Sequence, residues 1–253
     1  RRRQRQMCIR DRPTVNRFCR SMDTRGFPDF KLHLAQSLAN GTPYVNRNVD
    51  EDDSVESYTG KIFESAMASL DHVRQSLDNT AVNRAVDLLT QAKKIAFFGL
   101  GSSAAVAHDA MNKFFRFNVP VIYSDDIVLQ RMSCMNCSDD DVIVLISHTG
   151  RTKTLVELAQ LARENDAMVI ALTSPGTPLA REATLAITLD VPEDTDIYMP
   201  MVSRLAQLTV IDVLATGFTL RRGAKFRDNL KRVKEALKES RFDKELLIKS
   251  DDR

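Results

Sequence analysis

The chain has 253 residues, 43% of them hydrophobic, which allows one large domain or two modest ones with a sizeable core. No apolar run approaches the roughly 20 residues that cross a bilayer, the Arg-rich start lacks the apolar segment of a secretory signal, and four cysteines are too few for a disulfide framework. Composition therefore argues against a membrane-spanning or a disulfide-rich secreted protein and predicts a protein of the reducing cytoplasm without a membrane partner.

Charge is distributed unevenly along the chain. Residues 1–47 carry 11 Lys/Arg and three Asp/Glu, a net charge of +8, whereas residues 48–253 have a net charge of −6. A basic segment on an acidic body is typical of a protein with a polyanionic partner. Residues 13–47 alone carry only +3, so charge by itself gives weak support for nucleic-acid binding.

The basic region contains two different segments. Residues 1–12, RRRQRQMCIRDR, show no apolar periodicity and are expected to be a tail outside the fold. Pro13–Met22 predicts a short helix, because proline suits the first helical position and apolar residues follow with helical spacing. The residues that we expect on its buried face are Val15, Phe18, Cys19 and Met22.

Residues 41–54 have the composition of a turn-rich, charged linker. From about Ser54 to Leu77, apolar residues recur at steps of three and four, which predicts an amphipathic helix with one apolar stripe. This stripe either packs on the body of the protein or forms a dimer seam, and the sequence leaves both open. Its members are Thr59, Ile62, Ala66, Leu70, Val73 and Leu77.

Five short apolar runs then alternate with helix-like segments near residues 104–117, 128–134 and 154–165. The runs are continuous rather than alternating, as in a parallel sheet that is covered on both faces. This order predicts an α/β fold with a doubly wound, five-stranded parallel sheet, in which ligands bind beyond the carboxyl ends of the strands. The runs are Lys94–Phe98, Val119–Tyr123, Val142–Ile146, Met168–Leu172 and Leu185–Leu189.

The loop after the first run, Gly99–Ser103, combines two glycines with two hydroxyls. Glycine allows a tight turn and a close approach of the backbone to a ligand, and the helix that follows favours an anion at its N-terminus. The same residues with Ala104 also fit the dinucleotide pattern GxGxxA, with Asp125 and Asp126 near the place of a ribose-binding acid. That alternative leaves the next loop unexplained.

The loop after the third run, Ser147–Thr152, again joins a strand to a helix and concentrates hydroxyls, a glycine and backbone amides. One such loop is often only a helix cap, and Thr152 fits that role. Two such loops in one sheet predict a small ligand with a phosphate at one end and hydroxyls or a carboxylate along its length.

With these two loops, the span from about Ala81 to Leu220 resembles a SIS (sugar isomerase) domain. The loops match the GxGxS and S-x-[ST]-G-x-T motifs of that family, and Met201–Leu208 resembles the start of the helix after its last strand. The resemblance implies that residues 55–253, flanking helices included, form a phosphosugar-binding domain. The effector-binding residues that we expect are Gly101, Ser102, Ser103, Ser147, His148, Thr149, Gly150 and Thr152.

Pro13–Arg20 and Gly26–Lys31 resemble the recognition helix and the following turn of RpiR-type transcriptional regulators. The resemblance runs almost to the C-terminus and implies that residues 13–40 are the remnant of an all-α helix-turn-helix domain that binds operator DNA. Only 12 residues precede this helix, where the family has several helices, so we expect this chain to bind DNA weakly and without sequence preference. The DNA-contacting residues that we expect are Thr14, Asn16, Arg17 and Arg20.

Within that family, the chain most resembles regulators of hexose catabolism, which implies an acidic sugar phosphate such as 2-keto-3-deoxy-6-phosphogluconate as effector. An operator-reading regulator also implies a homo-oligomer. The alternative is a sugar-phosphate isomerase on the same fold. An isomerase needs a general base, for which Glu193 and His148 are the only candidates, and no catalytic residue is assigned.

Several other groups have an ordinary interpretation. Cys134 and Cys137 form a CxxC without a second pair or a nearby histidine, which favours two plain thiols over a metal or redox centre. Asp139–Asp141 fits a solvated turn, and Arg227–Lys249 fits a charged amphipathic helix used in packing or dimerisation. We therefore expect neither a metal nor a cofactor.

Overall fold

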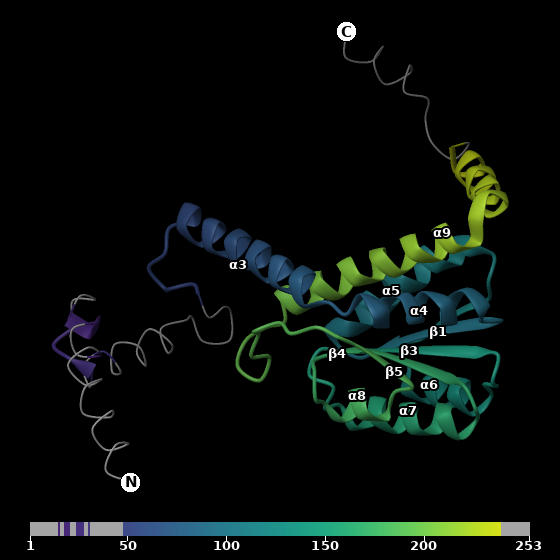
Figure 1. Ribbon diagram of the computed structural model, residues 1–253, viewed down its shortest axis with the longest axis horizontal. Coiled ribbons are helices and arrows are strands. Elements are labelled where there is room, and N and C mark those ends of the chain that lie inside the picture. Colours follow the sequence, from purple (N-terminus) through teal and green to yellow (C-terminus); the bar gives the residue numbers. More distant parts are fainter. Residues whose placement is uncertain (1–14, 16–17, 21–23, 28–29, 31–47, 239–253) are drawn as a thin grey trace, which may run out of the picture. The chain divides into compact units, whose positions relative to one another are not determined.

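The computed structural model describes residues 15, 18–20, 24–27, 30 and 48–238 (Figure 1). The chain divides into two compact units, one with residues 1–66 and 194–199, the other with residues 67–193 and 200–253. Helix α3 (Val55–Ser76) crosses this boundary along the chain. The second unit contains the whole sheet and therefore the two loops that the sequence singles out.

The second unit is built on one sheet of five parallel strands in the order β2-β1-β3-β4-β5. All five predicted strands are confirmed, with ends that differ by no more than two residues from those expected. The central strand β3 pairs with β1 from Lys94 opposite Asp141 to Gly99 opposite Ile146. The strands are β1 (Lys94–Gly99), β2 (Val121–Tyr123), β3 (Asp141–Ser147), β4 (Met168–Thr173) and β5 (Leu185–Thr188).

Helices cover both faces of this sheet (Figure 1). Side chains alternate along β1, so that Ile95 and Phe97 belong to one buried cluster while Ala96 and Phe98 belong to the other. The three-layer arrangement confirms the doubly wound α/β fold. On one face lie α4 (Asn79–Gln91), α5 (Ser102–Phe114) with the short η1 (Phe115–Phe117), and α9 (Val202–Lys238); on the other lie α6 (Ile127–Met135), α7 (Lys153–Glu164) and α8 (Pro178–Glu182).

The predicted amphipathic helix is confirmed as α3, but its stripe is only partly covered. Val73 is buried, and Leu70 and Leu77 pack against the core of the second unit, which supports the packing role of this end. Thr59 at the other end is exposed, and the alternative role of the stripe as a dimer seam stays a prediction. In the part of the chain that the structure describes, no helix is long and apolar enough to cross a membrane.

Helices α4 and α8 were not expected from the sequence. The buried face of α4 includes two alanines, Ala81 and Ala85, which give a weaker periodic signal than larger apolar residues. Asp78 caps this helix by accepting a hydrogen bond from the Thr80 N–H, 2.8 Å away. Helix α8 has only five residues, too few for a periodic pattern.

Helix α9 joins two segments that the sequence indicates separately. Gly223, with φ 77° and ψ −165°, departs from helical geometry within it, and Phe226 beyond this break still packs on Phe218 with 5.8 Å between ring centroids. The predicted helix Arg227–Lys249 is confirmed as far as Lys238. Its remainder lies outside the described residues.

In the first unit, Val15 and residues 18–20 are helical, as predicted for Pro13–Met22. The expected buried face is only partly confirmed: Cys19 is fully buried, but Val15 is 40% and Phe18 55% exposed. Phe18 makes an edge contact with Phe30, with 5.9 Å between ring centroids. Met22 lies outside the described residues.

Candidate functional site

The two loops singled out in the sequence lie side by side because of the strand order. From β1 the chain adds β2 on one side of the strand and then crosses to add β3 on its other side. The order in which strands are added to the sheet therefore reverses between β1 and β3. In a doubly wound sheet, the carboxyl ends of the strands at such a reversal form the usual ligand crevice. The Gly99–Ser103 loop follows β1 and the Ser147–Thr152 loop follows β3 at this edge.

The first loop keeps its backbone close to its own helix. A Cβ atom on Gly99 would lie 2.6 Å from the carbonyl oxygen of Ser103, so only glycine fits. Gly101 has a φ of 58°, which also favours glycine. Ser102 is half-buried and Ser103 is buried, and α5 begins with this pair of hydroxyls.

The second loop is fixed by Ser147 and Gly150. The Ser147 hydroxyl, buried at the end of β3, accepts a hydrogen bond from the Gly150 N–H at 3.2 Å. Gly150 has a φ of 56°, and a Cβ atom there would lie 2.5 Å from the Thr173 hydroxyl. Thr149 and Thr152 are half-buried, and α7 begins at the next residue, Lys153.

The helices that follow these loops differ from the other helices in how they begin. No side chain among the described residues accepts a hydrogen bond from the first turn of α5 or of α7, although Thr152 stands at the N-cap position of α7. Main-chain oxygens take up part of each first turn, since the Ser103 N–H donates to the Leu100 oxygen at 3.2 Å and the Leu155 N–H to the Thr152 oxygen at 3.0 Å. The helix dipole and the remaining N–H groups at these two ends favour an anion. The other α-helices described from Val55 onward, α3, α4, α6, α8 and α9, have such an acceptor, supplied in chain order by Ser54, Asp78, Asp126, Thr177 and Glu193.

His148 has both ring nitrogens engaged. Its Nε2 lies 3.2 Å from the carbonyl oxygen of Glu193, and since a carbonyl only accepts, Nε2 is the donor. Its Nδ1 lies 3.4 Å from the Ser174 hydroxyl. The ring therefore ties the loop after β3 to the loop after β4 and to the segment after β5.

The Glu193 carboxylate caps α9. Its oxygens accept hydrogen bonds from the N–H groups of Met201 and Val202, both at 2.8 Å, and of Ser203 at 3.1 Å, and from the Ser203 hydroxyl. Burial raises the pKa of Glu193, but the bonds from Ser203 and the two other amides outweigh burial, so its net pKa lies below the ordinary value of 4.5. Glu193 is thus an ionised structural cap.

Sequence reasoning missed the loop after β4. Thr173 and Thr177 bring their hydroxyls within 3.3 Å of each other, and the Ser174 N–H donates to the His148 carbonyl oxygen at 3.0 Å. This loop therefore borders the loop after β3. The signal in the sequence was a third strand end followed by hydroxyls and glycine, Thr173–Thr177, of the kind that identified the other two loops.

The remaining candidates have structural roles. Asp126 caps α6 through the Leu129 N–H at 2.9 Å, which does not favour a ribose contact. Burial raises the pKa of Cys134 to about 12 and also raises that of Cys137, so neither thiol is activated. Among the described residues, no three His, Cys, Asp or Glu side chains gather as a metal site would require.

Of the residues expected to contact DNA, only Arg20 is described, and it is helical and exposed. Thr14, Asn16 and Arg17 lie outside the described residues.

The sequence matches known domains in both of its parts. It matches the SIS domain over residues 88–217 and the helix-turn-helix domain of the rpiR family over residues 7–41. The first match contains both loops of the candidate site, and the second contains Arg20.

Relatives cover most of the chain. The HTH-type transcriptional regulator HexR of Escherichia coli (strain K12) is 94% identical over 95% of this chain and 83% of its own length. HexR of Pseudomonas aeruginosa is 56% identical over 91% of this chain and 81% of its own length. Among solved structures, the Vibrio vulnificus NanR protein complexed with ManNAc-6P has a TM-score of 0.67 at 24% identity, covering 91% of this chain and 82% of that one, which shows a common fold.

The ionised Glu193 cap makes a pH-dependent contribution to stability. Because its pKa is lowered in the folded state, the contribution is present above the ordinary pKa of 4.5 and is lost as pH falls through the folded pKa. Glu193→Gln should lower the free energy of unfolding by about 1 kcal/mol at pH 7, as loss of a helix cap does. Thermal unfolding of both proteins between pH 7 and pH 3 checks this.

The two unfolding curves should converge at the acidic end. Asp194→Asn, which removes the same charge from an exposed neighbour, is the control and should leave stability nearly unchanged. A difference between wild type and Glu193→Gln that stays constant across the range would contradict the ionised cap.

Proposed function

This chain belongs to the RpiR family of helix-turn-helix transcriptional regulators with a SIS domain, and we propose that a sugar phosphate bound at the loops after β1 and β3 controls its binding to operator DNA. The observation that carries the proposal is the pair of helices, α5 and α7, that begin at the ligand edge of the sheet without a side-chain acceptor. An acidic sugar phosphate supplies acceptors that no side chain provides there, its phosphate at one first turn and its carboxylate or hydroxyls at the other.

The ligand has a defined orientation in the proposed effector site. The phosphate lies at the first turn of α7, where Thr149, Gly150 and Thr152 surround it, and Ser147 donates its hydroxyl to the ligand. Gly101, Ser102 and Ser103 bind the hydroxyls or the carboxylate at the other end. An acidic sugar phosphate, such as 2-keto-3-deoxy-6-phosphogluconate, has this distribution of groups.

Isomerase activity on the same fold has no support from the site. A general base needs a free basic atom within reach of the carbon-bound proton. Glu193 is held by four hydrogen bonds at the start of α9, and His148 uses both ring nitrogens. We therefore assign this chain to regulation and not to catalysis.

Operator contact falls to the N-terminal helix in this proposal. Arg20 is exposed on it, as a base-edge or phosphate contact requires, and Thr14, Asn16 and Arg17 precede it in the sequence. A helix of about ten residues needs support from neighbouring helices to keep a fixed angle in the major groove.

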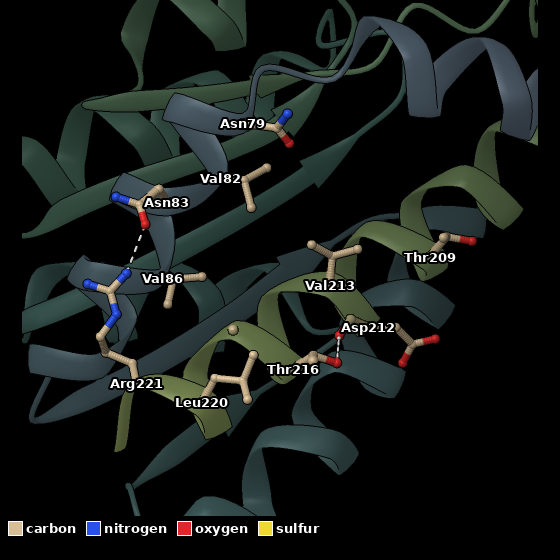
Figure 2. A pocket seen from close by; sticks show the side chains of 11 residues that line it. Asn79, Val82, Asn83, Val86, Thr209, Asp212, Val213, Thr216, Leu220 and Arg221 are labelled. Carbon is tan, nitrogen blue, oxygen red and sulfur yellow. Dashed lines mark hydrogen bonds between the residues drawn. The ribbon is translucent and has the colours of Figure 1, made fainter. Parts of the chain in front are cut away.

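A homodimer fits the exposed groove between α4 and α9, which has a volume of about 750 Å³ (Figure 2). Figure 2 shows Val82 and Val86 of α4 facing Val213 and Leu220 of α9 across it. Val213 is 40% and Leu220 is 67% exposed, so both large side chains retain apolar area for a second copy. A two-fold contact would place the same groove on both copies, as dimers of identical chains require.

The first experiment tests the effector site. Ser147→Ala should weaken binding of 2-keto-3-deoxy-6-phosphogluconate by about 1–3 kcal/mol, because a hydrogen bond to a charged ligand is lost. Calorimetry measures the affinity, and thermal unfolding shows separately whether loss of the bond to Gly150 loosens the loop. Ser138→Ala, an exposed serine just before the opposite end of β3, is the control and should bind like wild type. Equal affinity in Ser147→Ala and wild type would remove Ser147 from the site.

The second experiment tests DNA binding by mobility shift with operator and scrambled DNA at near-physiological salt. A version that carries the N-terminal segment of its 94% identical relative before Pro13 should prefer operator over scrambled DNA. In that version, Arg20→Ala should reduce the preference by about 1–3 kcal/mol. Arg116→Ala, an exposed arginine of the second unit, controls for charge. An unchanged operator preference in Arg20→Ala would contradict the proposed contact of Arg20 with DNA.

The third experiment tests the dimer by light scattering at micromolar concentration. Wild type should exceed the monomer mass of 28.5 kDa, and Val213→Asp should shift it toward that mass, because a charge in an apolar interface is costly. Val128→Asp is a matched control, since Val128 is a 65% exposed valine on the opposite face of the sheet. Dissociation by Val128→Asp alone would move the interface to α6.

A further inference from the structure

One residue, Glu193, connects the proposed effector loop to the start of the longest helix. Its main-chain oxygen binds the ring of His148, which lies inside the loop after β3, while its side chain holds the first turn of α9. We propose that His148 and Glu193 are positioning residues that couple the loop after β3 to the first turn of α9, so that effector binding changes the order of that turn. The claim that effector binding changes this turn, the effector part, rests on the proposed function. The claim that His148 holds the turn through Glu193, the mechanical part, concerns the free protein.

The His148 end of this connection is well fixed. Besides the two ring contacts, the His148 carbonyl oxygen accepts the Ser174 N–H at 3.0 Å. Both the ring and the peptide group of His148 therefore fix the loop after β3 to Ser174. The Nε2 donor to Glu193 and the Nδ1 contact to Ser174 orient the ring from opposite sides. His148 therefore cannot turn without breaking a bond to the segment after β5.

The Glu193 end is equally constrained. Both carboxylate oxygens are used, one by the N–H groups of Met201 and Val202 and the other by Ser203. Ser203 is buried, so its hydroxyl cannot exchange this bond for water without opening the first turn. A shift of the Glu193 backbone must therefore either carry the first turn of α9 with it or break this set of bonds.

The loop has a reason to shift when a ligand binds. The proposed contacts Ser147 and Thr149 flank His148 on both sides in the sequence. In the free protein, the Ser147 hydroxyl accepts the Gly150 N–H, and a phosphate that accepts this N–H competes with the bond. His148 lies between the altered groups, and its ring transmits the change to Glu193.

Hydrogen–deuterium exchange of the free protein tests the mechanical part. His148→Ala removes the donor to Glu193 and should speed amide exchange at Met201, Val202 and Ser203 on the order of tenfold. His148→Gln, whose amide N–H₂ reaches the place of Nε2, should keep exchange within about twofold of wild type. His108→Ala, a histidine on α5 that stacks on Tyr123, is the control for loss of an imidazole elsewhere.

Rescue by glutamine is a result that a merely structural histidine does not predict. If His148→Ala fails to fold, Ser174→Ala, which removes only the Nδ1 partner, should give a smaller increase at the same three amides. Unchanged exchange at these amides in folded His148→Ala would overturn the proposal. An equal increase in His148→Gln would do the same.

The same measurement with saturating 2-keto-3-deoxy-6-phosphogluconate tests the effector part. In wild type and His148→Gln, the ligand should change exchange at Met201–Ser203 by about fivefold or more, and in His148→Ala by less than about twofold, although calorimetry shows binding. Bound ligand without any change at these amides in wild type would overturn the coupling. Absence of binding in calorimetry would instead count against the proposed effector, and exchange in the free variants would still decide the mechanical part.

Discussion

The pairing of β1 with β3 is the constraint on which the site depends. These strands run parallel in register up to Gly99 opposite Ile146, and β3 continues only to Ser147, so the two strands end within one residue of each other. Because β2 lies on the outer side of β1, no other strand separates the two loops that follow. Two short peptide segments that are nearly 50 residues apart in the chain therefore lie next to each other at one edge of the sheet.

Helices α5 and α7, which begin at the ligand edge, lack a side-chain cap, whereas the other α-helices described from Val55 onward have one. A helix without an N-terminal acceptor forgoes about 0.5–2 kcal/mol that a capping side chain would contribute. The chain accepts this loss at α5 and α7, at the ligand edge, and provides carboxylate or hydroxyl acceptors at the other described α-helices. A bound anion would thus stabilise the two helices while occupying the site, which links ligand binding to the stability of the whole second unit.

Sequence patterns predicted the sheet well because each strand is a continuous apolar run between polar turns, and the runs end within two residues of the strands. They also located Gly99–Ser103 and Ser147–Thr152, since each loop is local in sequence. They failed where the determining contact is distant. His148 meets Glu193 across 45 residues and Ser174 across 26, and nothing in the local composition of the three segments indicates that they meet. The role of Glu193 as a cap was hidden for the same reason, because it lies ten residues before Ser203 instead of at the N-cap position.

The break at Gly223 sets how far a displacement along α9 can travel. Residues 202–222 form a continuous hydrogen-bonded rod, in which an axial shift of one turn displaces the next. At Gly223 the backbone leaves the helical region. A displacement of residues 202–222 along the helix axis is taken up there by rotation about the φ and ψ angles of Gly223. Phe226 resists that rotation because it rests on Phe117 and Phe218. A displacement at the ligand edge therefore does not pass along the helix beyond Gly223. The orientation of the last part of α9 is set by aromatic packing near the far end of α5.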